Sequence, residues 1–245
     1  MLRMKKFYLI ITAGLVRAFE LRLNHPKISL AIFLYTVYLP QNRIMNALII
    51  VDVQNDFLPG GSLAVEKGFN IFPAINSIQQ KFDLAVATQD WHPADHKSFA
   101  SSHPGKKIFD EIQLEGLAQV LWPDHCIQQS PGAGFSQRLD TKKIEAIFRK
   151  GMDKGIDSYS GFFDNGKKKA TGLAAYLKGR NITSVFVAGL AADFCVYFTA
   201  MDALDLGFGA SIIPDATMAI NNKSLQAKFD SFVSKGGVLV NSQDI

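Results

Sequence analysis

Four apolar stretches of the sequence each lead into residues that could carry out chemistry. Asp52 follows the first stretch, Asp90 and His92 follow the second, Lys150 ends the third, and Cys195 lies just beyond the fourth. In a parallel sheet covered by helices, ligands bind in the crevice outside the carboxyl ends of the strands. These side chains are therefore expected to meet at one edge of a sheet.

Two segments combine carboxylate and imidazole side chains in a pattern that suits a metal ion. Asp90 and His92 are two positions apart, and His125 follows in the segment Trp-Pro-Asp-His-Cys at 122–126. Such donors bind zinc or another divalent transition metal, and three protein ligands leave coordination positions open. In the alternative interpretation, His92 caps a turn and His125 is a hydrogen-bonded buried histidine. We favour the metal, because three of the five histidines, His96 included, lie in these two segments.

Cys195 is the candidate nucleophile. It lies near the expected start of a helix, where the helix dipole and an ammonium such as that of Lys150 hold a thiol partly as the thiolate that attacks carbonyl groups. Taken singly, each of these residues has a commoner role. A free cysteine usually packs as a small apolar residue, an aspartate after a strand caps a turn, and most lysines are solvated. Their convergence on the strand ends of one sheet favours a catalytic role.

From residue 45 onward, short β-branched apolar runs alternate with helix-length amphipathic stretches. This pattern predicts a three-layer α/β fold, with a mostly parallel six-stranded sheet and helices on both faces. Strands are expected at Ala47–Val51, Leu84–Thr88, Ala146–Phe148, Ser184–Ala188, Ala210–Ile213 and Val238–Val240, and helices near Ile71–Lys81, Lys168–Lys178, Phe194–Leu206 and Lys223–Ser234. The irregular stretch 90–134 is too long for an ordinary connection and is expected to be a functional loop region.

Six segments, in this order, carry a resemblance to a known family: Val51–Phe57, Gly60–Val65, Gln89–Pro93, Trp122–Cys126, Asp157–Asp164 and Gly189–Cys195. The chain resembles the nicotinamidases of the isochorismatase-like cysteine hydrolase superfamily over essentially all of residues 45–245. Residues 45–245 are accordingly expected to form a single hydrolase domain of that fold.

The resemblance implies a role for each strand-end residue. It makes Cys195 the nucleophile, Asp52 the acid and base, and Lys150 the third member of a catalytic triad. It makes Asp90, His92 and His125 the metal ligands, with His96 either a further ligand or a neighbour of the ligands. The backbone N–H groups of Ala191 and Cys195 would form the oxyanion hole, following a cis peptide bond at Leu190–Ala191. The pocket residues that it implies are Phe57, Trp122, Tyr159, Leu190 and Ala191.

The resemblance also implies a reaction. The expected activity is the hydrolysis of nicotinamide to nicotinate and ammonia through a thioester, in the salvage of pyridine nucleotides in the cytoplasm, with pyrazinamide accepted as well. The expected cofactor is one divalent metal ion, zinc before iron or manganese, and a homo-oligomer is compatible with this activity. The alternative within the superfamily is a metal-independent amidohydrolase of N-carbamoyl or ureido substrates, against which the Asp90, His92 and His125 set argues. A non-catalytic metal-binding protein would leave Cys195, Asp52 and Lys150 unexplained.

The net positive charge of the chain comes from its first 44 residues. Of 26 basic and 22 acidic residues, seven basic and one acidic fall there, a formal charge of +6; the 19 basic and 21 acidic residues that remain give the other 201 residues −2. The domain is therefore not expected to bind nucleic acid or an anionic membrane surface. The two cysteines, Cys126 and Cys195, exclude a disulfide-rich framework and leave one bridge or one reactive thiol open.

We interpret residues 1–44 as a leader upstream of the native start or as a weakly structured segment. Its apolar runs, Phe7–Val16 and Ile28–Leu39, are shorter than the roughly 20 residues that span a bilayer, and Arg17 lies where a signal-peptide cleavage site would need small residues.

We predict that translation starts at Met45, because Met45 directly precedes the first expected strand of a complete domain. Intact-mass measurement of the protein from its native host checks this. A species that retains residues 1–44 would contradict the prediction.

Overall fold

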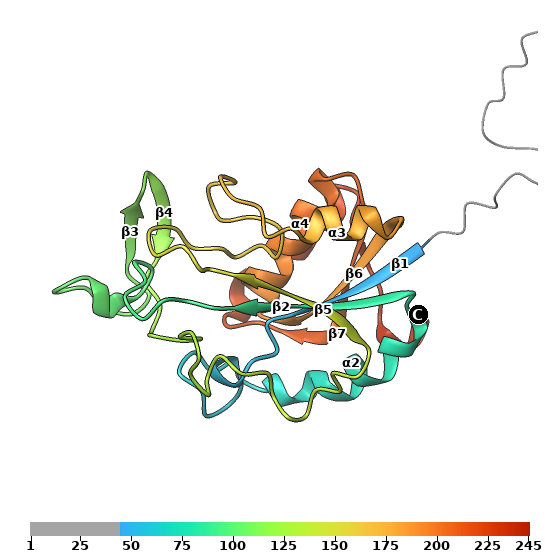
Figure 1. The fold of residues 1–245 in the computed structure, drawn as a ribbon, viewed down its shortest axis with the longest axis horizontal. Coiled ribbons are helices and arrows are strands. Elements are labelled where there is room, and N and C mark those ends of the chain that lie inside the picture. Colours follow the sequence, from blue (N-terminus) through green and yellow to red (C-terminus); the bar gives the residue numbers. More distant parts are fainter. Residues whose placement is uncertain (1–44) are drawn as a thin grey trace, which may run out of the picture. The chain divides into compact units, whose positions relative to one another are not determined.

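Six parallel strands form the central sheet in the computed structural model, which describes residues 45–245 (Figure 1). The strands are β1 (Met45–Val51), β2 (Leu84–Asp90), β5 (Ile144–Lys150), β6 (Ile182–Leu190), β7 (Gly209–Met218) and β8 (Val238–Leu239), in the order β5-β2-β1-β6-β7-β8. The predicted three-layer α/β fold is confirmed. The predictions about the leader and about the start at Met45 lie outside the described residues.

The burial of each strand follows from its place in the sheet. β2 is buried at every position and β1 at all but its first two, as expected for central strands of a parallel sheet. Along β1, Leu48 and Ile50 pack on one side of the sheet, and Ala47, Ile49 and Val51 pack on the other. β5 lies at the edge and alternates instead between partly buried and exposed residues.

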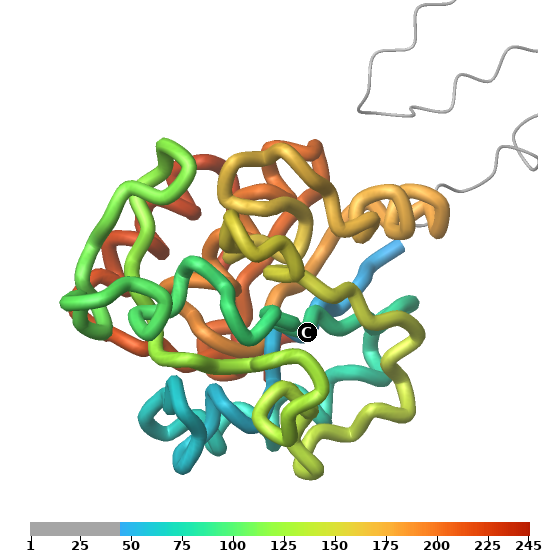
Figure 2. The backbone as a smooth tube through the Cα atoms, turned by 60° about the vertical axis from the view of Figure 1, so that its left-hand side comes forward, coloured from blue at the N-terminus to red at the C-terminus, as the bar shows by residue number. Residues whose placement is uncertain are grey.

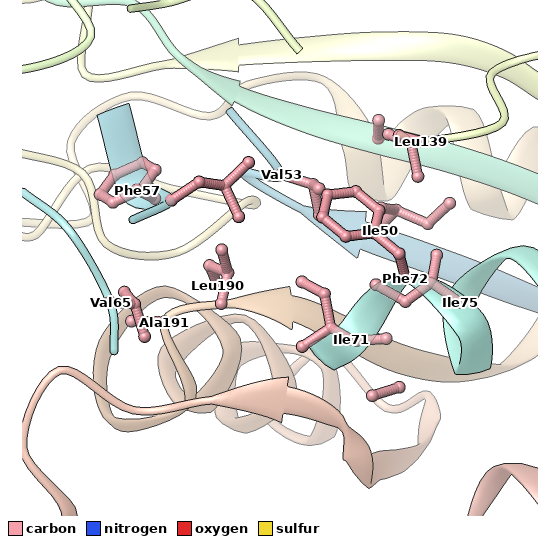
Figure 3. Close-up of a cluster of buried hydrophobic side chains, with 14 of the residues drawn as sticks. Ile50, Val53, Phe57, Val65, Ile71, Phe72, Ile75, Leu139, Leu190 and Ala191 are labelled. Carbon is pink, nitrogen blue, oxygen red and sulfur yellow. The ribbon is translucent and has the colours of Figure 1, made fainter. Parts of the chain in front are cut away.

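Helices cover both faces of the sheet (Figure 1). α2 (Phe72–Ile78) lies on one face, where its apolar side chains pack against those of β1 and the end of β6 (Figure 3). The opposite face is covered by α3 (Leu173–Gly179), α4 (Tyr197–Asp205) and α5 (Leu225–Ser234). Within residues 45–245, no helix is both long enough and apolar enough to cross a membrane.

The second predicted helix begins later than expected. It was predicted at Lys168–Lys178, but α3 starts only at Leu173. The carboxylate of Asp164 accepts hydrogen bonds from the backbone N–H groups of Gly166, Lys168 and Lys169, which holds this segment in a loop. Gly172, just before α3, has a φ of 95°, which a helix cannot contain.

Two other helices begin in tighter or wider turns than the α-helix. The helix predicted at Phe194–Leu206 opens with a π-helical turn over Ala192–Val196, and α4 proper begins at Tyr197. The helix predicted at Ile71–Lys81 is α2 flanked by two 3₁₀ turns, Gly68–Ile71 and Gln79–Lys81. A π-helical turn inside a helix often marks a functional site, and this one contains Cys195.

The long connection between β2 and β5 contains a hairpin that the sequence pattern did not predict. Its strands, β3 (Glu111–Leu114) and β4 (Leu117–Val120), are antiparallel and form a separate small sheet. The connection can be followed as the green to yellow-green part of the tube in Figure 2. Isolated bridges of Phe99 with Trp122 and of His92 with Ile127 tie its distant parts together. The connection thereby brings the segment of His125 next to that of His92.

A substitution pair, one at the centre and one at the edge of the sheet, tests this core. We expect Ile49→Ala to lower the free energy of unfolding by about 2–5 kcal/mol, because Ile49 is fully buried in the centre of the sheet. The matched change Ile147→Ala, on β5 where the side chain is 51% exposed, should cost less than about 0.5 kcal/mol. Denaturant unfolding of the two variants measures both values, and equal losses would contradict this description of the core.

Candidate active site

Four adjacent strands bring the candidate residues together at the carboxyl edge of the sheet. Asp52 follows β1, Asp90 ends β2 and Lys150 ends β5, with Asp90 and Lys150 paired in the register of the two strands. β6 ends at Leu190 and leads into the turn of Cys195. The order β5-β2-β1-β6 makes all four ends neighbours. The convergence expected from the sequence is present in the structure.

The ammonium of Lys150 lies at the centre of this group. Its Nζ is 2.6 Å from Oδ1 of Asp90 and 2.8 Å from Oδ2 of Asp52, and it donates to the backbone carbonyl of Ser158 at 2.9 Å and to Sγ of Cys195 at 3.4 Å. The side chain is fully buried. Burial alone would lower the pKa of Lys150, but the two carboxylates outweigh it and hold the pKa well above the usual value. Lys150 is therefore a permanent buried cation.

The two carboxylates that share this cation are driven apart in pKa. Burial would raise the pKa of Asp90, but Lys150 and the histidines beside it outweigh burial and hold that pKa far below its usual range. The pKa of Asp52 is raised by burial and by the charge of Asp90, which Lys150 only partly offsets. Of the two carboxyl groups, Asp52 is therefore the one whose raised pKa favours the exchange of a proton.

The position of Asp52 is fixed by its backbone and by one side chain. Its φ of 47° lies in the left-handed region, which turns the chain sharply after β1. The hydroxyl of Thr88 donates a hydrogen bond of 2.6 Å to Oδ1 of Asp52, while Oδ2 faces Lys150. Thr88 was not predicted as a site residue. Its signal in the sequence was its place two residues before Asp90 on β2, which puts both side chains on one face of that strand.

Cys195 faces the same group of charges. An oxygen of Asp52, an oxygen of Asp90 and Sγ of Cys195 all lie within 4.8 Å of one another. Burial raises the pKa of the Cys195 thiol well above its usual value; Lys150 opposes this and the carboxylates reinforce it. The resting residue is therefore a thiol and not the partial thiolate expected from the sequence, because burial outweighs the effect of Lys150. A base must take its proton before it can attack. Asp52 is placed to do so.

The turn before Cys195 has the cis peptide bond expected at Leu190–Ala191. Ala191 lines the cavity in front of Cys195, whereas Leu190 packs in the buried apolar cluster next to Val53 and Ala191 (Figure 3). The carboxylate of Asp193 accepts hydrogen bonds of 2.9 Å from the backbone N–H groups of Ile220 and Asn221, which anchors the turn to the segment after β7.

Three buried donors form a candidate metal centre on the other side of Asp90. Oδ2 of Asp90 is 3.5 Å from Nε2 of His92 and 3.8 Å from Nε2 of His125. Nδ1 of His92 donates to the carbonyl of Gly151 at 2.9 Å, and Nδ1 of His125 donates to that of Pro123 at 2.8 Å. Carbonyl partners on Nδ1 leave the Nε2 lone pairs free for a metal.

The donor set fits a divalent metal ion. Nε2 of His92 is buried and has no hydrogen-bond partner among the described residues, as expected of an atom that awaits a metal. Burial lowers the pKa of His125 to about 4, which keeps its imidazole neutral and able to ligate. Asp52, Asp90 and Cys195 also approach one another, but the ammonium of Lys150 already occupies the space between them.

His96 lies beside this centre, with its ring 4.5 Å from that of His92. The backbone N–H of Ser98 donates to Nδ1 of His96 at 3.1 Å, so a neutral His96 carries its proton on Nε2 and cannot offer that nitrogen to a metal. A buried carboxylate, Asp157, completes a second group with His92 and His96. His96 and Asp157 therefore lie close to His92 without a hydrogen bond to it.

A small cavity opens between the thiol and the candidate metal ligands. Of the predicted pocket residues, Phe57, Trp122, Tyr159 and Ala191 line it. The Tyr159 hydroxyl accepts hydrogen bonds from Gln119 and Trp122, which fixes the ring as a wall. Four further lining residues were not predicted for the site: Leu63, Asp157, Phe194 and Ile220. Three of them had a signal, since Leu63, Asp157 and Phe194 lie in segments on which the family resemblance rests, whereas Ile220 lies outside all six.

The second carboxylate of the first segment, Asp56, serves the loop rather than the cavity. Its Oδ2 accepts a 2.7 Å hydrogen bond from the backbone N–H of Cys126, next to His125. Any side chain at Gly132 would overlap the Asp56 carboxylate. Asp56 thus helps to hold the segment that carries His125.

Comparisons with known proteins identify the family of the chain. The model of the isochorismatase domain family matches residues 46–244. A nicotinamidase of Acinetobacter baylyi is 48% identical over 200 residues, covering 81% of this chain and 94% of that protein. A solved nicotinamidase and pyrazinamidase of Acinetobacter baumanii shares 46% identity at a TM-score of 0.80, covering 84% of this chain and 99% of the other. A pyrazinamidase of Pyrococcus horikoshii in complex with zinc shares 34% identity at a TM-score of 0.66, covering 80% and 98%.

The fold and the site together define a hydrolase of three-layer α/β architecture whose polar residues gather at the carboxyl edge of a parallel sheet. The chain belongs to the isochorismatase domain family, which matches almost all of the described residues.

Gly151 offers a test of the candidate metal centre that leaves its ligands unchanged. Gly151 has a φ of 65°, and a Cβ there would lie 2.4 Å from Cε1 of His92. We expect Gly151→Ala to displace His92 and to lower the affinity for zinc about 10–100-fold. Competition with a chromophoric zinc chelator measures the affinity.

Gly155→Ala is the matched control, because a Cβ at Gly155 meets only an ordinary contact of 3.8 Å. Wild-type zinc affinity in both variants would contradict the proposed ligand role of His92.

Proposed function

We propose that the protein hydrolyses nicotinamide to nicotinate and ammonia, with pyrazinamide as a second substrate. The observation that carries this proposal is that Cys195, Asp90 and His125 line one and the same cavity. A thiol with its base lies at one end of the cavity, and nitrogen and oxygen donors for a metal lie at the other. A flat ring with a carboxamide at one position and a nitrogen at another carries the two groups that this thiol and these metal donors would bind.

Asp90, His92 and His125 would hold one divalent metal ion, zinc before iron or manganese. Held by these residues, the metal would supply Lewis acidity for a ring nitrogen of the substrate. Phe57, Trp122 and Tyr159 enclose the ring with apolar surface, so that the carboxamide is held in reach of Cys195.

The first half of the reaction forms a thioester. Asp52 takes the proton of the Cys195 thiol, and the thiolate adds to the carboxamide carbon. The backbone N–H groups of Ala191 and Cys195 stabilise the oxyanion that develops. Asp52 then gives its proton to the amide nitrogen, the C–N bond breaks, and ammonia leaves. Lys150 keeps its charge throughout and stabilises the thiolate. In the resting site, Sγ of the thiol lies 3.4 Å from Nζ.

The second half returns the enzyme to its starting state. Asp52 takes a proton from a water molecule, whose oxygen adds to the thioester carbon. The C–S bond breaks, the sulfur regains a proton from Asp52, and nicotinate is released. One proton-carrying carboxyl group therefore serves both halves of the reaction.

The same proposal places the protein in the salvage of pyridine nucleotides, where free nicotinamide is returned to use as the acid. A buried catalytic thiol needs a reducing compartment, for which we propose the cytoplasm. Both free cysteines of the chain are buried, which is compatible with such a compartment.

The role of Cys195 is tested by ammonia release from nicotinamide by the zinc-loaded protein. We expect Cys195→Ala to lower kcat at least about 1,000-fold, because the nucleophile is removed. Cys126→Ala, which removes the other buried thiol, should stay within about threefold of wild type. Turnover that survives Cys195→Ala would refute the covalent mechanism, and turnover that is indifferent to complete chelation of the metal would favour N-carbamoyl or ureido substrates.

The raised pKa of Asp52 predicts the acid limb of the pH profile. Asp52 must be ionised to accept the thiol proton, so kcat/KM should fall as the pH decreases through its pKa. Because burial raises that pKa above the ordinary aspartate value of 3.8, we expect the limb above pH 4. Nicotinamide and pyrazinamide should give the same limb, with metal content measured at each pH as the control. A limb at or below pH 4 in fully loaded protein would contradict this assignment.

A further inference from the structure

The ammonium of Lys228, on α5, lies among three aromatic rings next to the nucleophile turn. Its Nζ is 4.5 Å from the ring centroid of Phe194, 5.4 Å from that of Tyr197 and 5.5 Å from that of Phe198. The same ammonium donates a hydrogen bond to the backbone carbonyl of Asp193. One side chain from a separate helix thus contacts both the backbone and the aromatic side chains around Cys195.

The ring beneath Lys228 is a wall of the substrate cavity. Phe194 lines the cavity and meets Trp122 edge-on, with ring centroids 4.8 Å apart and an interplanar angle of 88°. It also meets Tyr159 at 5.4 Å. Whatever fixes Phe194 therefore also fixes the aromatic enclosure in which the substrate ring would lie.

The π-helical turn that carries Phe194 and Cys195 has two attachments to later parts of the chain. The Asp193 carboxylate accepts the N–H groups of Ile220 and Asn221, and the Asp193 carbonyl accepts from Lys228. Lys228 is partly buried, and burial lowers its pKa while Asp193 raises it. A partly desolvated ammonium interacts more strongly with ring faces and carbonyls than an exposed one does.

We propose that Lys228 is a positioning residue for substrate binding: through the Asp193 carbonyl and the Phe194 ring it holds the π-helical turn and the cavity wall in the geometry that accepts the aromatic ring. This inference rests on the proposed hydrolysis of nicotinamide for its kinetic consequence. Its structural consequence, a turn fixed by Lys228, is independent of the substrate.

Three variants separate this role from a general contribution of α5 to stability. Lys228→Met keeps the length of the side chain and removes the charge and the donor. Lys228→Arg keeps a cation over the ring and a donor for the carbonyl. Lys223→Met removes an exposed lysine just before the same helix. All three are compared by hydrogen exchange of residues 192–198 and by the kinetics of nicotinamide hydrolysis in the zinc-loaded protein.

In Lys228→Met we expect the amides of residues 192–198 to exchange at least about tenfold faster and KM to rise at least about fivefold, with kcat within about twofold of wild type. A higher KM with an unchanged kcat is expected when the lost interaction was equally strong in the ground state and the transition state. Lys228→Arg should restore both values to within about twofold, and Lys223→Met should match wild type.

The outcomes distinguish the two claims. Wild-type exchange of residues 192–198 in Lys228→Met would overturn the inference about Lys228, whatever the substrate. Faster exchange with an unchanged KM would overturn its role in substrate binding. A wild-type protein that releases no ammonia from nicotinamide would instead refute the proposed function, and the exchange measurement would still decide whether Lys228 fixes the turn.

Discussion

One buried ammonium shared between two carboxylates is the interaction on which the site depends. Lys150 lies 2.6 Å from Asp90 and 2.8 Å from Asp52, and none of the three charges can reach bulk water. Burying charges is costly unless they are paired, and one cation cannot fully compensate two anions. The shortage of positive charge gives two chemically identical groups different pKa values. Asp90 stays ionised and available to a cation beyond it, while Asp52 is poised to bind and release a proton.

The fold supplies this arrangement through strand register. Asp90 pairs with Lys150 because β2 and β5 run parallel and end together, and Asp52 is added by a left-handed turn after β1. Gly151 follows Lys150 directly, and its backbone leaves room for the His92 ring while its carbonyl sets the tautomer of that ring. The metal donors and the catalytic group thus share Asp90, which is hydrogen-bonded to Lys150 and lies beside His92 and His125.

Much of this could be predicted from the sequence, because buried parallel strands are continuous apolar runs and their ends are marked by polar residues. Asp52, Asp90, Lys150 and Cys195 were placed at one sheet edge on that basis alone. What could not be predicted depends on contacts between residues far apart in the chain or on side-chain bonds to the backbone. The Asp164 carboxylate delays the start of α3, the β3–β4 hairpin lies within a stretch without periodicity, and Thr88 acquires its role only when β1 and β2 are paired. The contact between Phe194 and Lys228 could not be predicted either, because only the packing of α5 on the nucleophile turn brings them together.

The central claim is that Cys195 attacks a carbonyl carbon while the ring of the substrate reaches the Asp90, His92 and His125 donors. A crystal structure of the zinc-loaded protein with pyridine-3-carbaldehyde tests this most directly, because an aldehyde has no leaving group and the reaction stops after addition. The account predicts a covalent bond from Sγ of Cys195 to the aldehyde carbon, with the oxygen facing the N–H groups of Ala191 and Cys195 and the ring nitrogen directed at the metal. An aldehyde bonded to another residue, or a ring bound in the cavity with Cys195 unmodified, would contradict it.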